Sequence, residues 1–198
     1  MSWFRRTPLE GARWVVVDCE TSGLDAARDR LLSVGAIAVR GATLELQEFF
    51  QAKVRQETPS ARENIVIHGI GADAQLAGLP LKEVMSSLAA LVGDAIPVAF
   101  HAPFDAAILR RHGLALRARW LDLAAAAPAL FPDKGRRDSP LEHWLAAFGI
   151  AARARHDALG DAFATAQLLL VTLAEAKRQG VRSVEALREA ATSRFLRP

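Results

Sequence analysis

Cysteine is almost absent from this chain, and long apolar runs are missing. The 198 residues include a single cysteine, Cys19, so no internal disulfide can form. No uninterrupted apolar run is long enough to cross a bilayer, and the first residues, MSWFRR, lack the apolar core of a signal peptide. These absences argue against a disulfide-stapled secreted domain and predict a cytoplasmic protein with no membrane partner.

The composition is that of a soluble globular protein. Hydrophobic residues make up 51% of the chain and charged residues 24%, and the length suits one domain or one domain with a short appendage. The net charge is only +3, although the pI is about 9.6. Arginines form short clusters such as Arg110-Arg111 and Arg136-Arg137. Such clusters suit phosphate groups, but solvated arginines also occur on any protein surface.

Two carboxylates stand at the end of the most apolar strand-forming segment. The run Val15-Val16-Val17 predicts a buried strand that continues through Asp18 and Glu20. Side chains two residues apart on a strand point to the same face, about 6.5 to 7 Å apart, so the two acids would converge. A divalent cation such as Mg²⁺ or Mn²⁺ commonly neutralises such a pair. The alternative is an ordinary turn after the strand.

The remaining pattern indicates strands first and then a mixture of strands and helices. Further strands are expected over 31–39, 44–50 and 97–100, and helices over 81–93, 104–111, 141–148, 158–177 and 183–191. This order predicts an α/β fold that begins with an antiparallel meander.

Two more acidic positions occur later in the chain. Asp105 lies at a strand-to-helix junction, where a carboxylate is also favoured simply by the helix N-terminus. Asp157 is placed to cap the long helix, which leaves His156 in the preceding loop and Asp161 one turn inside. From that loop an imidazole can reach a site lined by Asp161 and act as a general base. The alternative is that Asp161 faces water, because it lies off the apolar stripe.

Together these residues resemble the three exonuclease motifs of the DEDDh family. That family includes the proofreading ε subunit of bacterial DNA polymerase III, RNase T and oligoribonuclease. The residues that match the motifs are, in order, Asp18 and Glu20, then Asp105, then His156 with Asp161. The resemblance covers roughly residues 14–175, and residues 67–70 resemble a His-Gly-Ile element that the family carries between the first two motifs. The combination is specific, although no single motif is.

Two positions depart from the family pattern. The second motif usually reads His-Asn-Ala-x-Phe-Asp, and Phe100 and His101 occupy the His and Asn places here. Cys19 stands between the two acids of the first motif, where threonine is frequent. Neither change removes a metal ligand. The resemblance therefore still implies activity, with a difference expected in the hydrogen bonds that support Asp105 or in the shape of the substrate cleft.

The resemblance implies a ribonuclease H-like fold, with a five-stranded mixed sheet flanked by helices. It implies a single exonuclease domain over residues 1–198, with a short helical extension from about residue 178. It also implies two divalent ions per site, Mg²⁺ or Mn²⁺. The implied roles are that Asp18 bridges both ions, Glu20 and Asp161 hold the ion that activates water, Asp105 helps to hold the other, and His156 accepts the proton of the attacking water.

The implied reaction is hydrolysis of single-stranded nucleic acid from the 3′ end, with DNA favoured and nucleoside 5′-monophosphates released. By similarity, Thr21, Leu24 and Phe104 would contact the terminal nucleotide. One alternative is an exoribonuclease that acts on RNA or oligoribonucleotides. Another is a catalytically silent nucleic-acid-binding subunit, although retention of all five motif residues argues against it. A DNA polymerase subunit and a second copy of this chain are the further partners that the resemblance allows.

Overall fold

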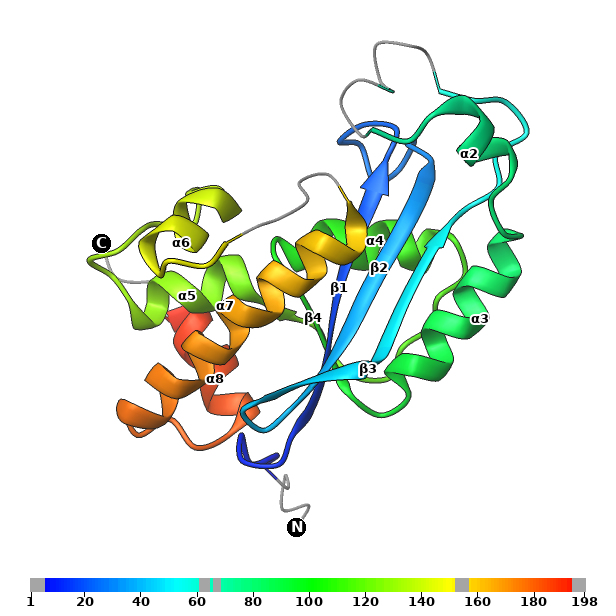
Figure 1. Cartoon of the computed structure of the whole chain (residues 1–198). Helices are drawn as coiled ribbons and strands as arrows, with labels where there is room; N and C mark the ends of the chain where they lie inside the picture. The colour runs from blue at the N-terminus through cyan, green and yellow to red at the C-terminus, as the bar shows by residue number, and fades with distance from the viewer. Residues whose placement is uncertain (1–5, 61–64, 66–68, 152–156, 194–198) are drawn as a thin grey trace.

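A five-stranded mixed sheet forms the centre of the structure, a computed structural model that describes residues 6–60, 65, 69–151 and 157–193 (Figure 1). The strand order is β3-β2-β1-β4-β5. The strands are β1 (Arg13–Thr21), β2 (Leu31–Arg40), β3 (Thr43–Lys53), β4 (Ile96–Ala99) and β5 (Leu121–Asp122). The first three pair antiparallel as the predicted meander, whereas β1, β4 and β5 run parallel. The predicted five-stranded mixed sheet is therefore confirmed.

Helices cover both faces of this sheet (Figure 1). The helices are α2 (Ala72–Leu76), α3 (Leu81–Val92), α4 (Ala102–Arg111), α5 (Leu123–Leu130), α6 (Leu141–Ala147), α7 (Ala158–Arg178) and α8 (Val184–Ser193). Helix α7 lies across β1 and β2 and contacts α5 and α6, and α8 packs against α5. Helices α3 and α4 pack on the opposite face.

Strand β1 separates the two apolar cores by its alternating side chains. Val16 belongs to the core beneath α7, whereas Val15 and Val17 belong to the core beneath α3 and α4. Successive side chains of a strand point to opposite faces of the sheet. Asp18 and Glu20 continue the alternation from Val16, so they point to the face that α7 covers.

Three short elements, α2, β5 and α5, were not predicted from the sequence. Strand β5 has only two residues and is defined by its pairing with β4. Helix α5 reads LAAAAPAL, and seven of its eight residues are buried. A helix that is apolar all round has no polar face from which a helical period can be detected.

Helix α7 is, within the described residues, the one helix that is long and apolar enough to cross a membrane by length and composition. However, 56% of its most apolar stretch is buried inside the protein. Core helices of globular proteins pass the same test, and the contacts of α7 with β1 and β2 are those of a core helix.

The first turn of α7 rests on β2 at Gly35. Gly35 lies directly opposite Asp18 in the register of β1 and β2, so both residues face α7. A Cβ atom at Gly35 would overlap the backbone of Ala158 and Leu159. The helix can approach the strand this closely only because position 35 has no side chain.

Replacing Gly35 with alanine should push α7 away from the sheet. The added methyl group would meet helix backbone rather than a flexible side chain. We therefore expect the free energy of unfolding, measured with a chemical denaturant, to fall by about 1–3 kcal/mol.

Gly71→Ala is the matched control, since a Cβ there meets nothing within 4 Å. It should change the unfolding free energy by less than about 1 kcal/mol. An unchanged denaturation midpoint for Gly35→Ala would contradict the close approach of α7.

Candidate functional site

Three carboxylates meet where β1 ends and α7 begins. Asp18 and Glu20 come from β1, and Asp161 comes from the first turn of α7. One ligand oxygen from each residue lies within 4.8 Å of those of the other two. Asp161 is only 6% exposed, and the two strand acids are half-buried. The structure thus brings together three of the predicted site residues, and Asp161 does not simply face water.

Asp157 fixes the start of α7 and with it the position of Asp161. Its carboxylate accepts a hydrogen bond from the Gly160 backbone N–H at 3.0 Å, as expected for an N-cap. The side-chain amide of Gln51, on β3, donates to the other carboxylate oxygen at 2.7 Å. The predicted cap is confirmed, and it is tied to the sheet as well as to the helix.

His156, the predicted general base, lies outside the described residues. The same is true of residues 67 and 68, the first two of the predicted His-Gly-Ile element. The proposal of a base at His156 therefore rests on its place in the sequence, next to the capping residue Asp157.

The chemistry of the three-carboxylate group fits a divalent metal ion. Like charges at this separation repel, and partial burial strengthens the repulsion because water screens the charges less. The group offers only carboxylate oxygens, which are the ligands that hard divalent cations prefer. A bound cation would therefore both neutralise the group and be held by it.

Asp105 is not part of the group that lies within 4.8 Å. It projects from α4, on the face of the sheet opposite to α7, and is 5% exposed. Burial raises the pKa of its carboxyl to about 7, although hydrogen bonds from the Cys19 thiol and the Asp105 and Cys19 backbone N–H groups oppose the rise. Asp105 is thus held against the strand that carries Asp18 and Glu20, and its metal role stays a prediction.

Asp105 is supported by a hydrogen bond from Cys19. Cys19 lies between the two strand acids in sequence and packs against the core beneath α3 and α4. Burial raises the pKa of the Cys19 thiol well above its ordinary value, and the carboxylates of Asp105 and Asp18 raise it further. The thiol therefore stays protonated at neutral pH and donates to Asp105, a bond that a threonine hydroxyl could also make.

The loop after β1 presents Leu24 to solvent and is built around Asp29. Leu24 is 94% exposed. The Asp29 carboxylate accepts hydrogen bonds from the Ser22 hydroxyl at 2.9 Å and the Asp25 backbone N–H at 2.7 Å. A Cβ at Gly23 would lie 2.6 Å from this carboxylate, so glycine leaves room for it. The sequence indicated the turn but not the role of Asp29, because its bonds lie within an irregular loop that has no period to mark it.

Arg111 of α4 braces the same loop from the side. Its guanidinium donates to the Ala26 carbonyl at 2.9 Å and to the Asp29 carbonyl. The three predicted substrate contacts come from neighbouring parts of this frame: Thr21 ends β1, Leu24 lies in the loop, and Phe104 is on α4. Their contact with a nucleotide stays a prediction.

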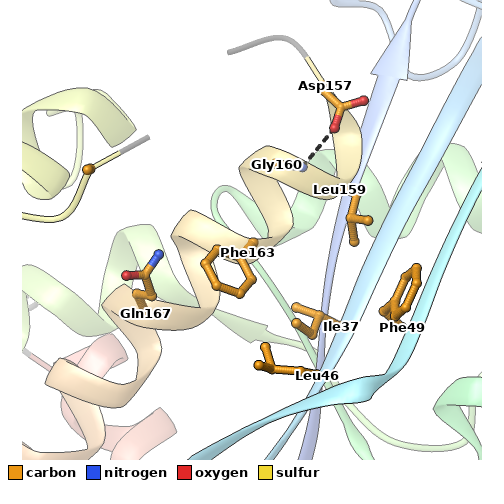
Figure 2. Close-up of a pocket in the computed structure, with 9 residues that line it drawn as sticks. Ile37, Leu46, Phe49, Asp157, Leu159, Gly160, Phe163 and Gln167 are labelled. Atoms are coloured by element: carbon orange, nitrogen blue, oxygen red, sulfur yellow. Dashed lines mark hydrogen bonds between the residues drawn. The ribbon is translucent and has the colours of Figure 1, made fainter. Parts of the chain in front are cut away.

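An apolar groove of about 590 Å³ lies between α7 and strands β2 and β3 (Figure 2). Leu46 and Phe49 of β3, which are 64% and 53% exposed, face Phe163 of α7 across it. Asp157 is the charged residue of its lining, and none of the three clustered carboxylates belongs to it. The groove is therefore distinct from the acidic site.

Comparison with known sequences supports the predicted exonuclease family. A sequence model of the exonuclease family (RNase_T) matches residues 15–169. The DNA polymerase III subunit epsilon-like protein of Rhodobacter capsulatus is 31% identical over 182 residues, which cover 88% of this chain and 26% of that protein. The PolC-type DNA polymerase III of Bacillus subtilis is 29% identical over 188 residues, which cover 91% of this chain and 13% of that protein. The chain thus spans about a quarter or less of the length of these curated relatives.

Solved exonucleases share the fold. E. coli exonuclease I in complex with a dT13 oligonucleotide matches with a TM-score of 0.71 and 21% identity, covering 85% of this chain and 42% of that one. Exonuclease X in complex with 5′ overhanging duplex DNA matches with a TM-score of 0.69 and 21% identity. The match covers 90% of this chain and 99% of that one. The predicted ribonuclease H-like fold is confirmed by these likenesses.

Replacing Asp161 with asparagine should stabilise the metal-free protein and weaken its response to metal. Removing one of three crowded carboxylates relieves a repulsion of about 1 kcal/mol, so the melting temperature in EDTA should rise. The same change removes a ligand, so the rise in melting temperature that Mg²⁺ or Mn²⁺ gives the wild type should shrink by more than half.

Asp133→Asn serves as the control, because Asp133 is an exposed acid outside the three-carboxylate group. It should leave both the metal-free melting temperature and the metal response unchanged. A full metal response in Asp161→Asn would show that the ion binds elsewhere.

Proposed function

This chain belongs to the exonuclease family, and from that premise we propose that it is a metal-dependent 3′-to-5′ exonuclease. Its proposed substrate is single-stranded nucleic acid, with DNA as the preferred polymer. The observation that carries the proposal is the group formed by Asp18, Glu20 and Asp161 within 4.8 Å. The oligonucleotide bound by E. coli exonuclease I, which has the same fold, adds support for a single-stranded substrate.

Mg²⁺ or Mn²⁺ is the proposed cofactor, with two ions per site. Asp18, Glu20 and Asp161 would supply most of the ligands, and Asp105 would complete the set. When bound, divalent ions provide the positive charge that stabilises the phosphate oxygens and lowers the pKa of the attacking water.

His156 is the proposed general base. An imidazole has a pKa near neutrality, so its neutral form is available to accept the proton of the attacking water. In the sequence it is bonded directly to Asp157, whose own hydrogen bonds to Gly160 and Gln51 fix the backbone at that point. The carboxylates of the site would therefore bind the metal ions, and the imidazole would accept the proton of the attacking water.

Leu24 is proposed to touch the terminal base, together with Thr21 and Phe104. The 94% exposure of Leu24 leaves an apolar side chain available, and the bonds of Asp29 and Arg111 hold its loop in place. Apolar and stacking contacts with bases tolerate every sequence and contribute about 1–3 kcal/mol per base. Contacts to the phosphate do not separate DNA from RNA, so the 2′-hydroxyl must be tested directly.

A 5′-labelled single strand should be shortened progressively by the wild type in Mg²⁺ or Mn²⁺, with release of nucleoside 5′-monophosphates. EDTA or Asp18→Asn should lower the rate by at least about 10²–10³-fold, because charge stabilisation at the phosphate is lost. Gel analysis of matched DNA, RNA and dinucleotide substrates would rank the polymers. Asp133→Asn is again the control, and full turnover by Asp18→Asn would overturn the assignment.

His156→Ala should slow hydrolysis by about 10²–10⁴-fold if the imidazole is the base. The increase in melting temperature on adding metal should be retained, because His156 is not one of the proposed ligands. Single-turnover rates measured beside the metal response would separate the two effects. An unchanged rate would place the base at another residue.

A further inference from the structure

We propose that this chain has a second binding site, for a phosphate oxyanion, formed by Arg119 and Arg188 at the end of the sheet opposite to the carboxylates. A cavity of about 410 Å³ lies there, beside the first residues of β1 and β4. Its walls combine the arginine pair with small and apolar residues such as Ala12, Ile96 and Val184. Ala12 directly precedes β1 and Asp18 lies six residues further along the chain, so the two sites are well separated.

Arg188 of α8 lines this cavity, and in the described part of the chain one N–H group of its guanidinium is unpaired. One of its terminal nitrogens donates to the Arg119 carbonyl oxygen. Its Nε–H is buried and, within the residues that the structure describes, has no hydrogen-bond acceptor. Buried donors are nearly always paired, because an unpaired one is costly. A phosphate oxygen is a well-matched acceptor for a guanidinium, which can bind it through two N–H groups.

Arg119 adds a second positive charge next to the first. Burial lowers the pKa of Arg188, and the charge of Arg119 lowers it further. Two guanidinium groups in one cavity repel each other, whereas an anion between them attracts both. Arg119 is exposed and lines the cavity, so it is available to a ligand that enters from solvent.

The nearby acids do not cancel this pair. The Glu185 carboxylate partly offsets the effect of Arg119 on Arg188, but it also accepts a hydrogen bond from the Thr7 backbone N–H at 2.9 Å. Arg13, which also lines the cavity, pairs with Glu48 at 2.7 Å. Asp94 is an exposed carboxylate of the lining, so water screens its charge. Among the residues that line the cavity, three arginines therefore stand against one acid, Asp94.

The family match does not account for this site. The match ends at residue 169, whereas Arg188 lies on α8, which begins at Val184. The site also shares no residue with the three-carboxylate group. Phosphate binding here is therefore independent of exonuclease activity, and the two proposals can fail separately.

Calorimetric titration and melting temperatures in EDTA would test the site. Without metal the carboxylate group repels anions, so it cannot bind the probes. The probes are inorganic phosphate, a nucleoside 5′-monophosphate and a short single-stranded oligonucleotide, each compared with chloride at equal ionic strength. We expect saturable binding of at least one probe, and the tightest one identifies the source of the phosphate. Arg188→Met and Arg119→Met should each weaken it at least tenfold.

Arg117→Met is the matched control, since Arg117 is exposed and does not line the cavity. It should bind the probe as tightly as the wild type. Arg119 is also exposed, so Arg119→Met should fold normally and decides the test even if Arg188→Met unfolds. The proposal is overturned if no probe binds beyond the chloride baseline, or if binding survives in Arg119→Met.

Discussion

The approach of α7 to β2 at Gly35 is the contact on which the acidic site depends. Gly35 faces Asp18 across the strand pair, and its missing side chain lets the first turn of the helix rest on the sheet. That turn carries Asp161. A glycine on one strand therefore sets the distance between two acids that lie far apart in the sequence, and the Asp157 cap holds the same turn in place.

The two faces of β1 carry different residues of the site. Asp18 and Glu20 continue the side of the strand that packs beneath α7, and they meet Asp161 there. Cys19 continues the other side and bonds to Asp105 of α4. Alternation along one strand thus gives the three-carboxylate group and Asp105 different neighbours on β1.

The sequence predicted what depends on local pattern. The alternation before Asp18 and Glu20 and the cap at Asp157 are readable from neighbouring residues, and the structure confirms both. The roles of the acids in the site were predicted from the family resemblance, because each acid also had an ordinary structural explanation. Arg188 could not be found in this way, because its partner Arg119 lies 69 residues away in the sequence. Asp29 bonds within its own loop, which has no regular period to mark it. Helix α5 was not predicted for another reason: because it is buried on all sides, its sequence shows no helical alternation of polar and apolar residues.

The burial of α7 has a consequence for the dynamics of the protein. Asp161 belongs to a helix whose following turns pack into the main core, and its own N–H donates to the Asp157 carbonyl at 2.9 Å. Segments of this kind exchange their amide hydrogens only through the largest openings of a protein. One acid of the site thus belongs to a helix that packs into the main core, whereas the exposed Leu24 belongs to a loop that hydrogen bonds hold in place.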